Sequence, residues 1–249
     1  MKSKLMMAAA AAVLIVSAGA PAFAKPSPAI VAAVADKARP EVDTKRDEAR
    51  MPAEMLDFAG IKPGQTVADF LPGGGYFTRV FAKAVGPKGT VYALVPEQQL
   101  ANKEKPPAII GVAADPAYGN IKIVPMTFVT LNLPTQADVI WTAENYHDLH
   151  LDRLKLDVAA VNKAVFNALK PGGYYIVLDH VAADGAPVDV ANTLHRIDPA
   201  IVKKELEAAG FKYINESKVL RRASDDHTKK VFELHDATDQ FIYKFQRPK

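Results

Sequence analysis

The stretch from Gln65 to Val85 constrains the fold of this chain most, because a strand pattern passes through a glycine-rich turn into a helix pattern. Residues 65–70 are short, β-branched and apolar, as in a buried strand, and follow the turn pair Pro63-Gly64. Apolar residues then recur at helical spacing from Phe77 to Val85. Between them, Gly73-Gly74-Gly75 lets the backbone approach a ligand, and the free N–H groups that begin the helix are donors for it. The sequence therefore predicts a strand, a ligand-binding turn and a helix.

Strand and helix patterns continue to alternate along the rest of the chain. Further strand patterns cover residues 89–95, 121–124, 137–142, 174–179, 211–220 and 240–245. Helix patterns cover residues 52–60, 77–85, 154–169 and 198–210. Such alternation favours a parallel sheet with helices on both faces. We expect one α/β domain over residues 51–249, preceded by a charged, partly helical segment at 25–50.

The glycine turn has a specific arrangement of residue types. Asp69 ends the strand, and Gly73 and Gly75 follow it, while the phrase Leu169-Lys170-Pro171-Gly172-Gly173 precedes a later strand. In these features the chain resembles class I S-adenosylmethionine (SAM) dependent methyltransferases. The resemblance implies SAM as cofactor and a doubly wound, seven-stranded Rossmann-like sheet of order 3-2-1-4-5-7-6 with the last strand antiparallel. A dinucleotide fingerprint would need a glycine where Thr78 stands. A structural turn without a ligand is the other alternative.

The resemblance also indicates which residues contact the cofactor. They are Asp69, Gly73, Gly74, Gly75, Thr78 and Glu97. In the family an acidic residue at the end of the second strand holds the ribose hydroxyls, but Val95 occupies that position here. Glu97 would have to replace it from the following loop. The residue that often holds the adenine amino group falls near Met126 or Thr127, where no carboxylate stands.

Candidate catalytic residues follow the fourth and fifth strands and precede a later helix, because open parallel sheets bind ligands at the carboxyl ends of their strands. They are Asn145, Tyr146, His147, Asp148, His180 and His195. Methyl transfer requires alignment of donor and acceptor and, where needed, removal of a proton. We expect His147 to act as the base or to orient the acceptor, with Asp148 fixing its tautomer.

A metal site is an alternative use of the same segments. Its donors would come from His147, Asp148, His150, His180 and His195, which suit zinc or another divalent ion. No His-x-x-x-His pair on a helix organises them, so the sequence analysis assigns no metal ligand. Three functions stay open: an exported SAM-dependent methyltransferase with a small-molecule acceptor, which we prefer, a non-catalytic binding module on that fold, and a metal-dependent hydrolase.

Residues 1–24 have the pattern of a secretory signal peptide. Lys2 and Lys4 precede an apolar run, and Ala22-Phe23-Ala24 forms a small-x-small cleavage site. An uncleaved anchor is the alternative, but we expect cleavage and a periplasmic or secreted protein. The chain contains no cysteine, which excludes disulfides and thiolate chemistry. A net charge of +3 does not indicate nucleic acid, and no later apolar run predicts membrane insertion.

Two arginine sites allow more than one interpretation. Residues 41–50 mix both charges, which usually indicates a solvated helix face, although Arg46 and Arg50 could instead lie over the glycine turn. Arg196 could pair with Asp179 or Asp198, or hold an anionic substrate.

Overall fold

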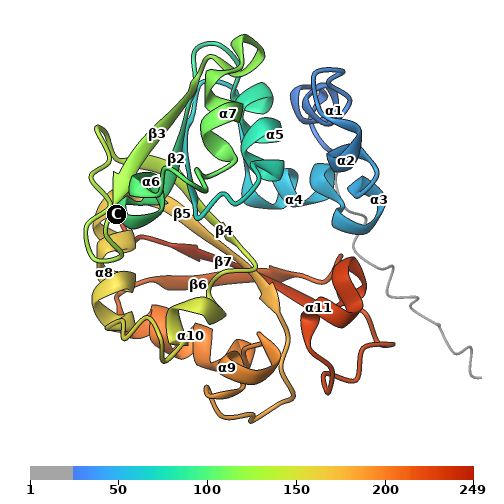
Figure 1. Ribbon diagram of the computed structural model, residues 1–249, viewed down its shortest axis with the longest axis vertical. Helices are drawn as coiled ribbons and strands as arrows, with labels where there is room; N and C mark the ends of the chain where they lie inside the picture. Colours follow the sequence, from blue (N-terminus) through green and yellow to red (C-terminus); the bar gives the residue numbers. More distant parts are fainter. Residues whose placement is uncertain (1–24) are drawn as a thin grey trace, which may run out of the picture.

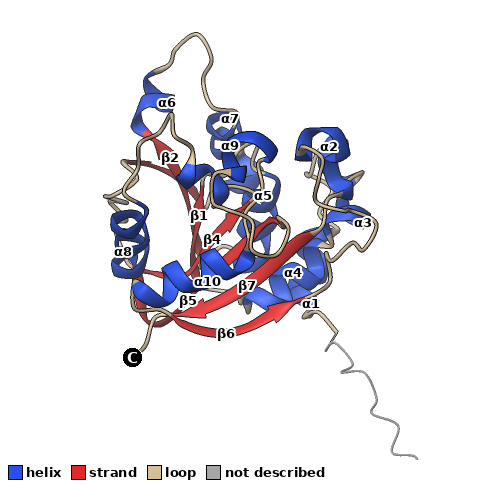
Figure 2. Ribbon diagram, turned by 90° about the horizontal axis from the view of Figure 1, so that it is seen from below, coloured by secondary structure: helices blue, strands red, loops and turns tan. Residues whose placement is uncertain are grey.

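A computed structural model describes residues 25–249 and shows a sheet with helices on both faces (Figures 1 and 2). The predicted signal peptide lies outside the described residues. The strands are β1 (Thr66–Phe70), β2 (Thr90–Pro96), β3 (Ile121–Met126), β4 (Ala137–Ala143), β5 (Leu169–His180), β6 (Lys212–Ser217) and β7 (Gln240–Gln246). They form one seven-stranded sheet of order β3-β2-β1-β4-β5-β7-β6, in which β7 is antiparallel to β5 and β6. The predicted fold class and strand order are confirmed.

The helices belong to three groups along the chain. Before the sheet lie α1 (Pro28–Val34), α2 (Glu41–Thr44), α3 (Asp47–Arg50) and α4 (Pro52–Ala59). Within the parallel part lie α5 (Tyr76–Val85), α6 (Glu97–Ala101), α7 (Ile109–Ala114), η1 (Pro116–Tyr118), η2 (His147–His150) and α8 (Val158–Ala168). After β5 come α9 (Val190–Leu194), α10 (Pro199–Ala208), α11 (Val231–Leu234) and η3 (His235–Ala237).

Side chains alternate across the sheet and separate the core into two clusters. On β4, Val139 and Trp141 belong to the cluster beneath α1, α4, α5 and α7, whereas Ile140 belongs to the cluster beneath α8 and α10. The covering helices supply fully buried residues at helical spacing, such as Val161 and Val165 of α8. The period of two in strands and of 3.6 in helices therefore lets both faces be buried at once.

Two predicted boundaries differ in the structure. The helix expected at 154–169 begins only at Val158, because Asp157 caps it by accepting a hydrogen bond from the N–H of Ala160. It ends at Ala168, and Leu169 already pairs with Ala137 as the start of β5. Pro171 has no N–H to continue a helix, which fits this early end. The strand expected at 211–220 is limited to β6, and its pairing with β7 shifts register between Tyr213 and Asn215.

The position of β1 determines where a ligand can bind. β1 pairs with β2 on one side and with β4 on the other. The strands that follow β1 are therefore added first on one side of it and then on the other, which makes β1 the switch point of the sheet. Crevices beyond the carboxyl ends of strands at such a switch point are the usual ligand sites of open α/β sheets. Within residues 25–249, no helix combines the length and apolar character needed to cross a membrane.

Candidate functional site

The glycine loop, residues 71–75, connects β1 to α5 at this switch point. Leu71, Gly73 and Gly75 all have positive φ angles, of 62°, 55° and 82°. Left-handed conformations are accessible to glycine at little cost, whereas at Leu71 they are strained. A Cβ at Gly73 would meet no atom within 4 Å, but a Cβ at Gly75 would lie 3.0 Å from Cδ1 of Ile109. Gly73 therefore faces open space, and Gly75 permits close packing of α7.

Two cavities meet at the glycine loop. One has a volume of about 600 Å³ and the other of about 330 Å³, and both are lined by Leu71, Pro72, Gly73 and Asn145. The larger cavity has mainly apolar walls, with amide and hydroxyl groups and the charged side chains of Asp148 and Arg153 among them. Its further lining residues include Val95, Gln98, Gln99, Ile109, Thr127, Phe128, Asp148 and Leu154. It can accept a flat or apolar group with hydrogen-bonding edges.

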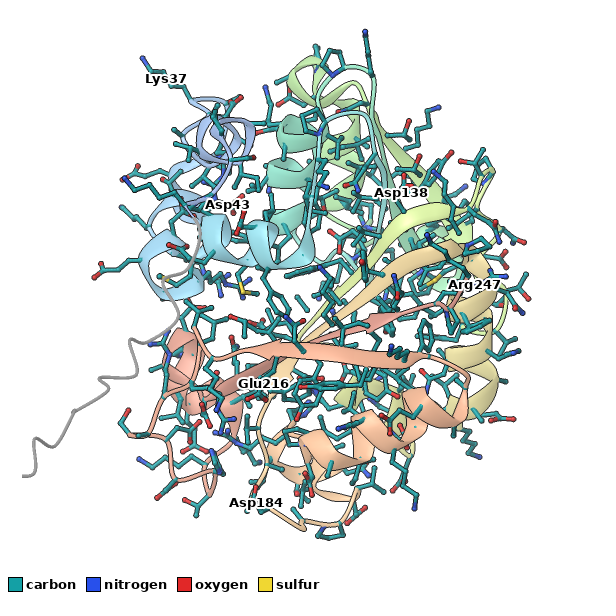
Figure 3. All side chains as sticks on the ribbon, turned by 180° about the vertical axis from the view of Figure 1, so that it is seen from behind. Lys37, Asp43, Asp138, Asp184, Glu216 and Arg247 are labelled. Atoms are coloured by element: carbon teal, nitrogen blue, oxygen red, sulfur yellow. The ribbon has the colours of Figure 1, made fainter. Side chains whose placement is uncertain are left out.

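The smaller cavity is charged. Its charged lining residues are Asp43, Arg46, Arg50, Asp69 and Glu144. Arg50 binds both carboxylate oxygens of Glu144 at 3.0 and 2.9 Å, and Arg46 donates from Nε to Asp236 at 2.7 Å. Asp43, labelled in Figure 3 on the amino-terminal helical segment, accepts a hydrogen bond from Arg79 of α5. The structure thus shows Arg46 and Arg50 beside the glycine loop and not on a purely solvated helix face.

Asp69 lies buried at the base of the charged cavity. Its Oδ2 accepts a hydrogen bond of 2.6 Å from the hydroxyl of Thr78. Burial raises the pKa of Asp69 to about 7, and the hydrogen bond from Thr78 opposes this only partly. A cationic group bound in this cavity would favour the ionised form of Asp69.

The six predicted cofactor residues have different positions. Asp69, Gly73 and Gly74 line the charged cavity. Gly75 and the fully buried Thr78 support the loop from behind. Glu97 is exposed at the start of α6 and lines neither cavity, whereas Gln98 and Gln99 line the larger one. Helix α6 therefore presents Gln98 and Gln99, and not Glu97, to the cavity.

His147 of η2 is fixed by a residue that the sequence analysis had placed only at a strand end. Its Nδ1 lies 2.8 Å from Oδ1 of Asp179, and its backbone N–H donates to Oδ2 at 2.7 Å. Asp179 is fully buried in β5. Asp179, and not Asp148 as expected, therefore sets the tautomer of His147. The sequence signal for this role was the position of Asp179 at the end of the fifth strand.

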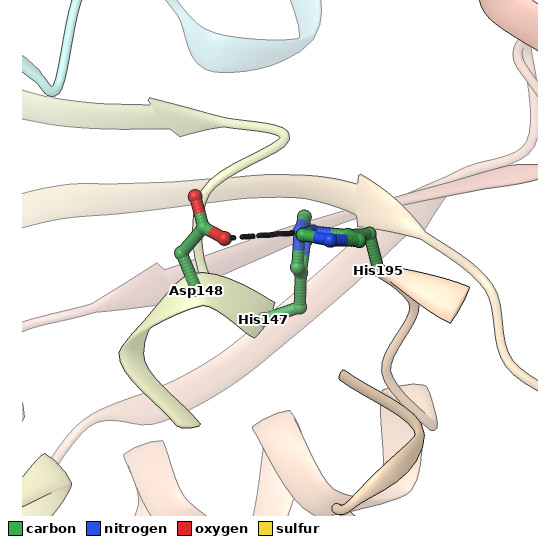
Figure 4. Close-up of side chains that lie close together, drawn as sticks. All are labelled: His147, Asp148 and His195. Carbon is green, nitrogen blue, oxygen red and sulfur yellow. Dashed lines mark ion pairs between the residues drawn. The ribbon is translucent and has the colours of Figure 1, made fainter. Parts of the chain in front are cut away.

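His147, Asp148 and His195 form a cluster in which the three side chains point toward one another (Figure 4). Nε2 of His147 lies 3.4 Å from Oδ1 of Asp148, and Nδ1 of His195 lies 3.8 Å from the same oxygen. The two imidazole rings are 5.4 Å apart and nearly perpendicular. Asp148 is the member that lines the cavity.

The electrostatic surroundings favour the protonated form of His147. Burial lowers its pKa, but the Asp179 carboxylate, helped by Asp148, raises it above the ordinary value overall. In turn, His147 holds the pKa of Asp179 below its ordinary value despite burial. The expected role of His147, as base or as a group that orients the acceptor, stays a prediction.

The remaining predicted residues differ in their access to the cavities. Asn145 lines both cavities and donates a hydrogen bond to the Leu71 carbonyl at 3.2 Å. Tyr146 is fully buried and donates to Glu205. The ring of His180 is 6.0 Å from that of His147 and hydrogen-bonds Thr238. Tyr146 and His180 thus support the site and do not line either cavity.

Arg196 is also structural. It is fully buried and binds both oxygens of Asp225 at 2.9 and 3.0 Å. Neither Asp179 nor Asp198, the partners considered from the sequence, holds its guanidinium. The true partner lies in the segment between β6 and β7, which this pair anchors.

Comparison with known proteins gives a consistent result at the level of the fold. No protein-family model and no curated protein matches the chain. A SAM-dependent methyltransferase from Aquifex aeolicus is 20% identical with a TM-score of 0.59, covering 84% of this chain and 99% of that one. An arsenic(III) SAM methyltransferase from Chlamydomonas reinhardtii is 20% identical with a TM-score of 0.54, covering 90% and 74%.

A structure named as the cyclase SpnF is 13% identical with a TM-score of 0.58, covering 88% of this chain and 91% of that one. One fold thus carries more than one activity among these neighbours. At these identities the similarity establishes architecture. The chain therefore has the Rossmann-like fold of SAM-dependent methyltransferases.

Proposed function

We propose that this protein is an exported SAM-dependent methyltransferase that acts on a small-molecule acceptor. One observation carries the proposal: a larger, mainly apolar cavity and a smaller, charged cavity are both lined by residues 71–73 at the switch point of the sheet. SAM has the same two parts, an adenosine and a zwitterionic amino acid, joined at the sulfonium. No nucleic-acid partner is part of the proposal.

Each part of SAM would meet suitable groups. The adenosine would lie in the larger cavity against Val95 and Phe128, with the Gln98 amide and the Thr127 hydroxyl for its polar edges. The amino group would be held by Asp69 and the carboxylate by Arg50 in the charged cavity. Ionisation of the buried Asp69 would then be stabilised by the ligand's positive charge.

SAM supplies a methyl group on a positively charged sulfur, and the chain aligns it with an acceptor. Asn145 lines both cavities, so the acceptor would lie on its side of the glycine loop, near Asp148. His147, held by Asp179, fixes the segment that carries Asp148. These residues position the acceptor and exclude water.

A non-catalytic binding module is the second candidate, and Val95 favours it. Val95 is buried, lines the larger cavity and offers no carboxylate to ribose hydroxyls. Both candidates bind a ligand at the glycine loop. They differ in turnover, which is measured as the S-adenosylhomocysteine formed in the presence of candidate acceptors.

Titration calorimetry with SAM and S-adenosylhomocysteine tests binding, with a matched pair of glycine variants. Gly73 and Gly64 both have positive φ, and a Cβ added at either would meet no atom within 4 Å, but only Gly73 lines the cavities. Each alanine substitution should cost about 1–2 kcal/mol of stability through backbone strain. Gly73→Ala should also abolish binding, whereas Gly64→Ala should leave it unchanged.

Absence of binding by the unmodified protein with both ligands would refute the proposal. Equal loss of affinity in the two variants would show that the glycine loop is not the binding site.

A further inference from the structure

Methyl transfer assigns no chemical task to the imidazoles of His147 and His195. Yet His147, Asp148 and His195 each direct one donor atom to a common point, and these atoms all lie within 4.8 Å of one another. His147 and Asp148 come from η2, and His195 is the residue that follows α9. His195 adopts a left-handed conformation, with φ of 54°, and its ring lies edge-on to that of His147.

The orientation of His147 matches that of a metal ligand. Its Nδ1 is bonded to the buried Asp179 carboxylate, so Nδ1 carries a proton and Nε2 faces Asp148 and His195. Metal-binding histidines characteristically donate their second ring N–H to a carboxylate in this way.

The distances fit a small tetrahedral centre. Zn–N and Zn–O bonds of about 2.0–2.2 Å separate neighbouring tetrahedral ligands by roughly 3.3–3.6 Å. The observed separation of His147 Nε2 and Asp148 Oδ1 is 3.4 Å, and that of His195 Nδ1 and Asp148 Oδ1 is 3.8 Å. Small rotations of the partly exposed Asp148 and His195 side chains would complete the geometry.

We propose that His147, Asp148 and His195 bind one divalent transition-metal ion, with Asp179 as the positioning residue behind His147. Two imidazoles and a carboxylate suit zinc and its neighbours in the first transition row. Three protein ligands leave a fourth position open, and Asp148 places it at the edge of the 600 Å³ cavity. This proposal differs from the expectation from the sequence, where no metal ligand was assigned because no His-x-x-x-His pair on a helix organises the donors.

Local charge supports a cation at this point. Asp148 and Asp179 bring two carboxylates to the cluster, which attract a cation, while the positive charges of Arg153 and Lys230 act on His195 and oppose this attraction. His150 is excluded, because its Nε2 lies 3.2 Å from Glu205 on another side of η2.

The test is equilibrium dialysis of chelator-washed protein, produced without a histidine tag, against zinc chloride, followed by elemental analysis. The unmodified chain should retain one zinc ion per molecule. His195→Ala and Asp148→Asn should each lose it, and both side chains are exposed enough, at 25% and 29%, for the variants to fold. His150→Ala is the matched control from the same segment and should bind as the unmodified chain does.

A fourth variant tests the positioning role. Asp179→Asn should weaken zinc affinity by about 10–100-fold, because the tautomer of His147 is no longer fixed. The proposal would be overturned if the unmodified chain retained no zinc, or if His195→Ala and Asp148→Asn retained as much zinc as the unmodified chain. No SAM or acceptor is present in this experiment, so its result is independent of the proposed methyltransferase function.

Discussion

Replacing Asp69 with asparagine should remove a large part of the pH dependence of folding stability. Burial raises the pKa of this carboxyl from an ordinary value of 3.8 to about 7 in the folded protein. Between these two values the folded chain retains a proton that the unfolded chain has released. Its contribution to stability is therefore fully present below pH 3.8 and is lost as pH rises towards 7. Asparagine resembles the protonated carboxyl in shape and carries no charge at any pH.

The magnitude follows from the interval between the two pKa values. Each pH unit corresponds to about 1.36 kcal/mol, so the whole interval corresponds to about 4 kcal/mol. Between pH 5 and pH 8 alone, the expected part is about 3 kcal/mol. Because Asp69 is buried, solvent screening reduces this value little. In the Asp69→Asn variant the new side-chain amide can still accept the hydrogen bond from Thr78 through its oxygen.

The assay is urea denaturation of both proteins at several pH values from 5 to 8. Subtracting the two curves removes the contribution of other titrating groups that are common to both proteins. Stability of Asp69→Asn relative to the unmodified protein should rise with pH by about 3 kcal/mol over this range. A difference that stays constant with pH would show that Asp69 is not buried as a high-pKa carboxyl, and would refute the reasoning.

Three further predictions concern other parts of the chain. Arg196→Met should lower the free energy of unfolding in urea by about 3–5 kcal/mol, because it leaves the buried Asp225 without its charged partner. Lys45→Ala removes an exposed ion pair and should lower it by less than about 1 kcal/mol, and equal losses in the two variants would contradict this reasoning. Val95→Asp should strengthen SAM binding in calorimetry, because the carboxylate gains hydrogen bonds to the ribose hydroxyls, while lowering stability of the free protein; weaker binding would place the ribose elsewhere. Amino-terminal sequencing of periplasmic protein should begin at Lys25, and an intact leader in membrane fractions would contradict signal cleavage.

The sequence alone determined the layered architecture. Apolar patterns are local: Val139-Ile140-Trp141 is a continuous apolar run, as in a strand buried on both faces, and Val161 and Val165 recur at helical spacing, so both are legible without any knowledge of the partner. Alternation of the two patterns then predicted the parallel part of the sheet, and the family resemblance supplied the order of the last two strands. The glycine loop was equally visible, because left-handed turns select glycine at Gly73 and Gly75.

Only the tertiary structure decided which polar residues meet. Asp179 binds His147 across 32 residues of sequence, and Arg50 binds Glu144 across 94. Such pairs depend on strand register and on the path of each loop, and neither leaves a periodic signal in the chain. The same reason explains why Glu97 points to solvent while Gln98 lines the cavity, and why His195 joins His147 while His150 turns to Glu205. A rotation of one residue in a short helix or loop reverses what a side chain faces, and tertiary packing alone fixes that rotation.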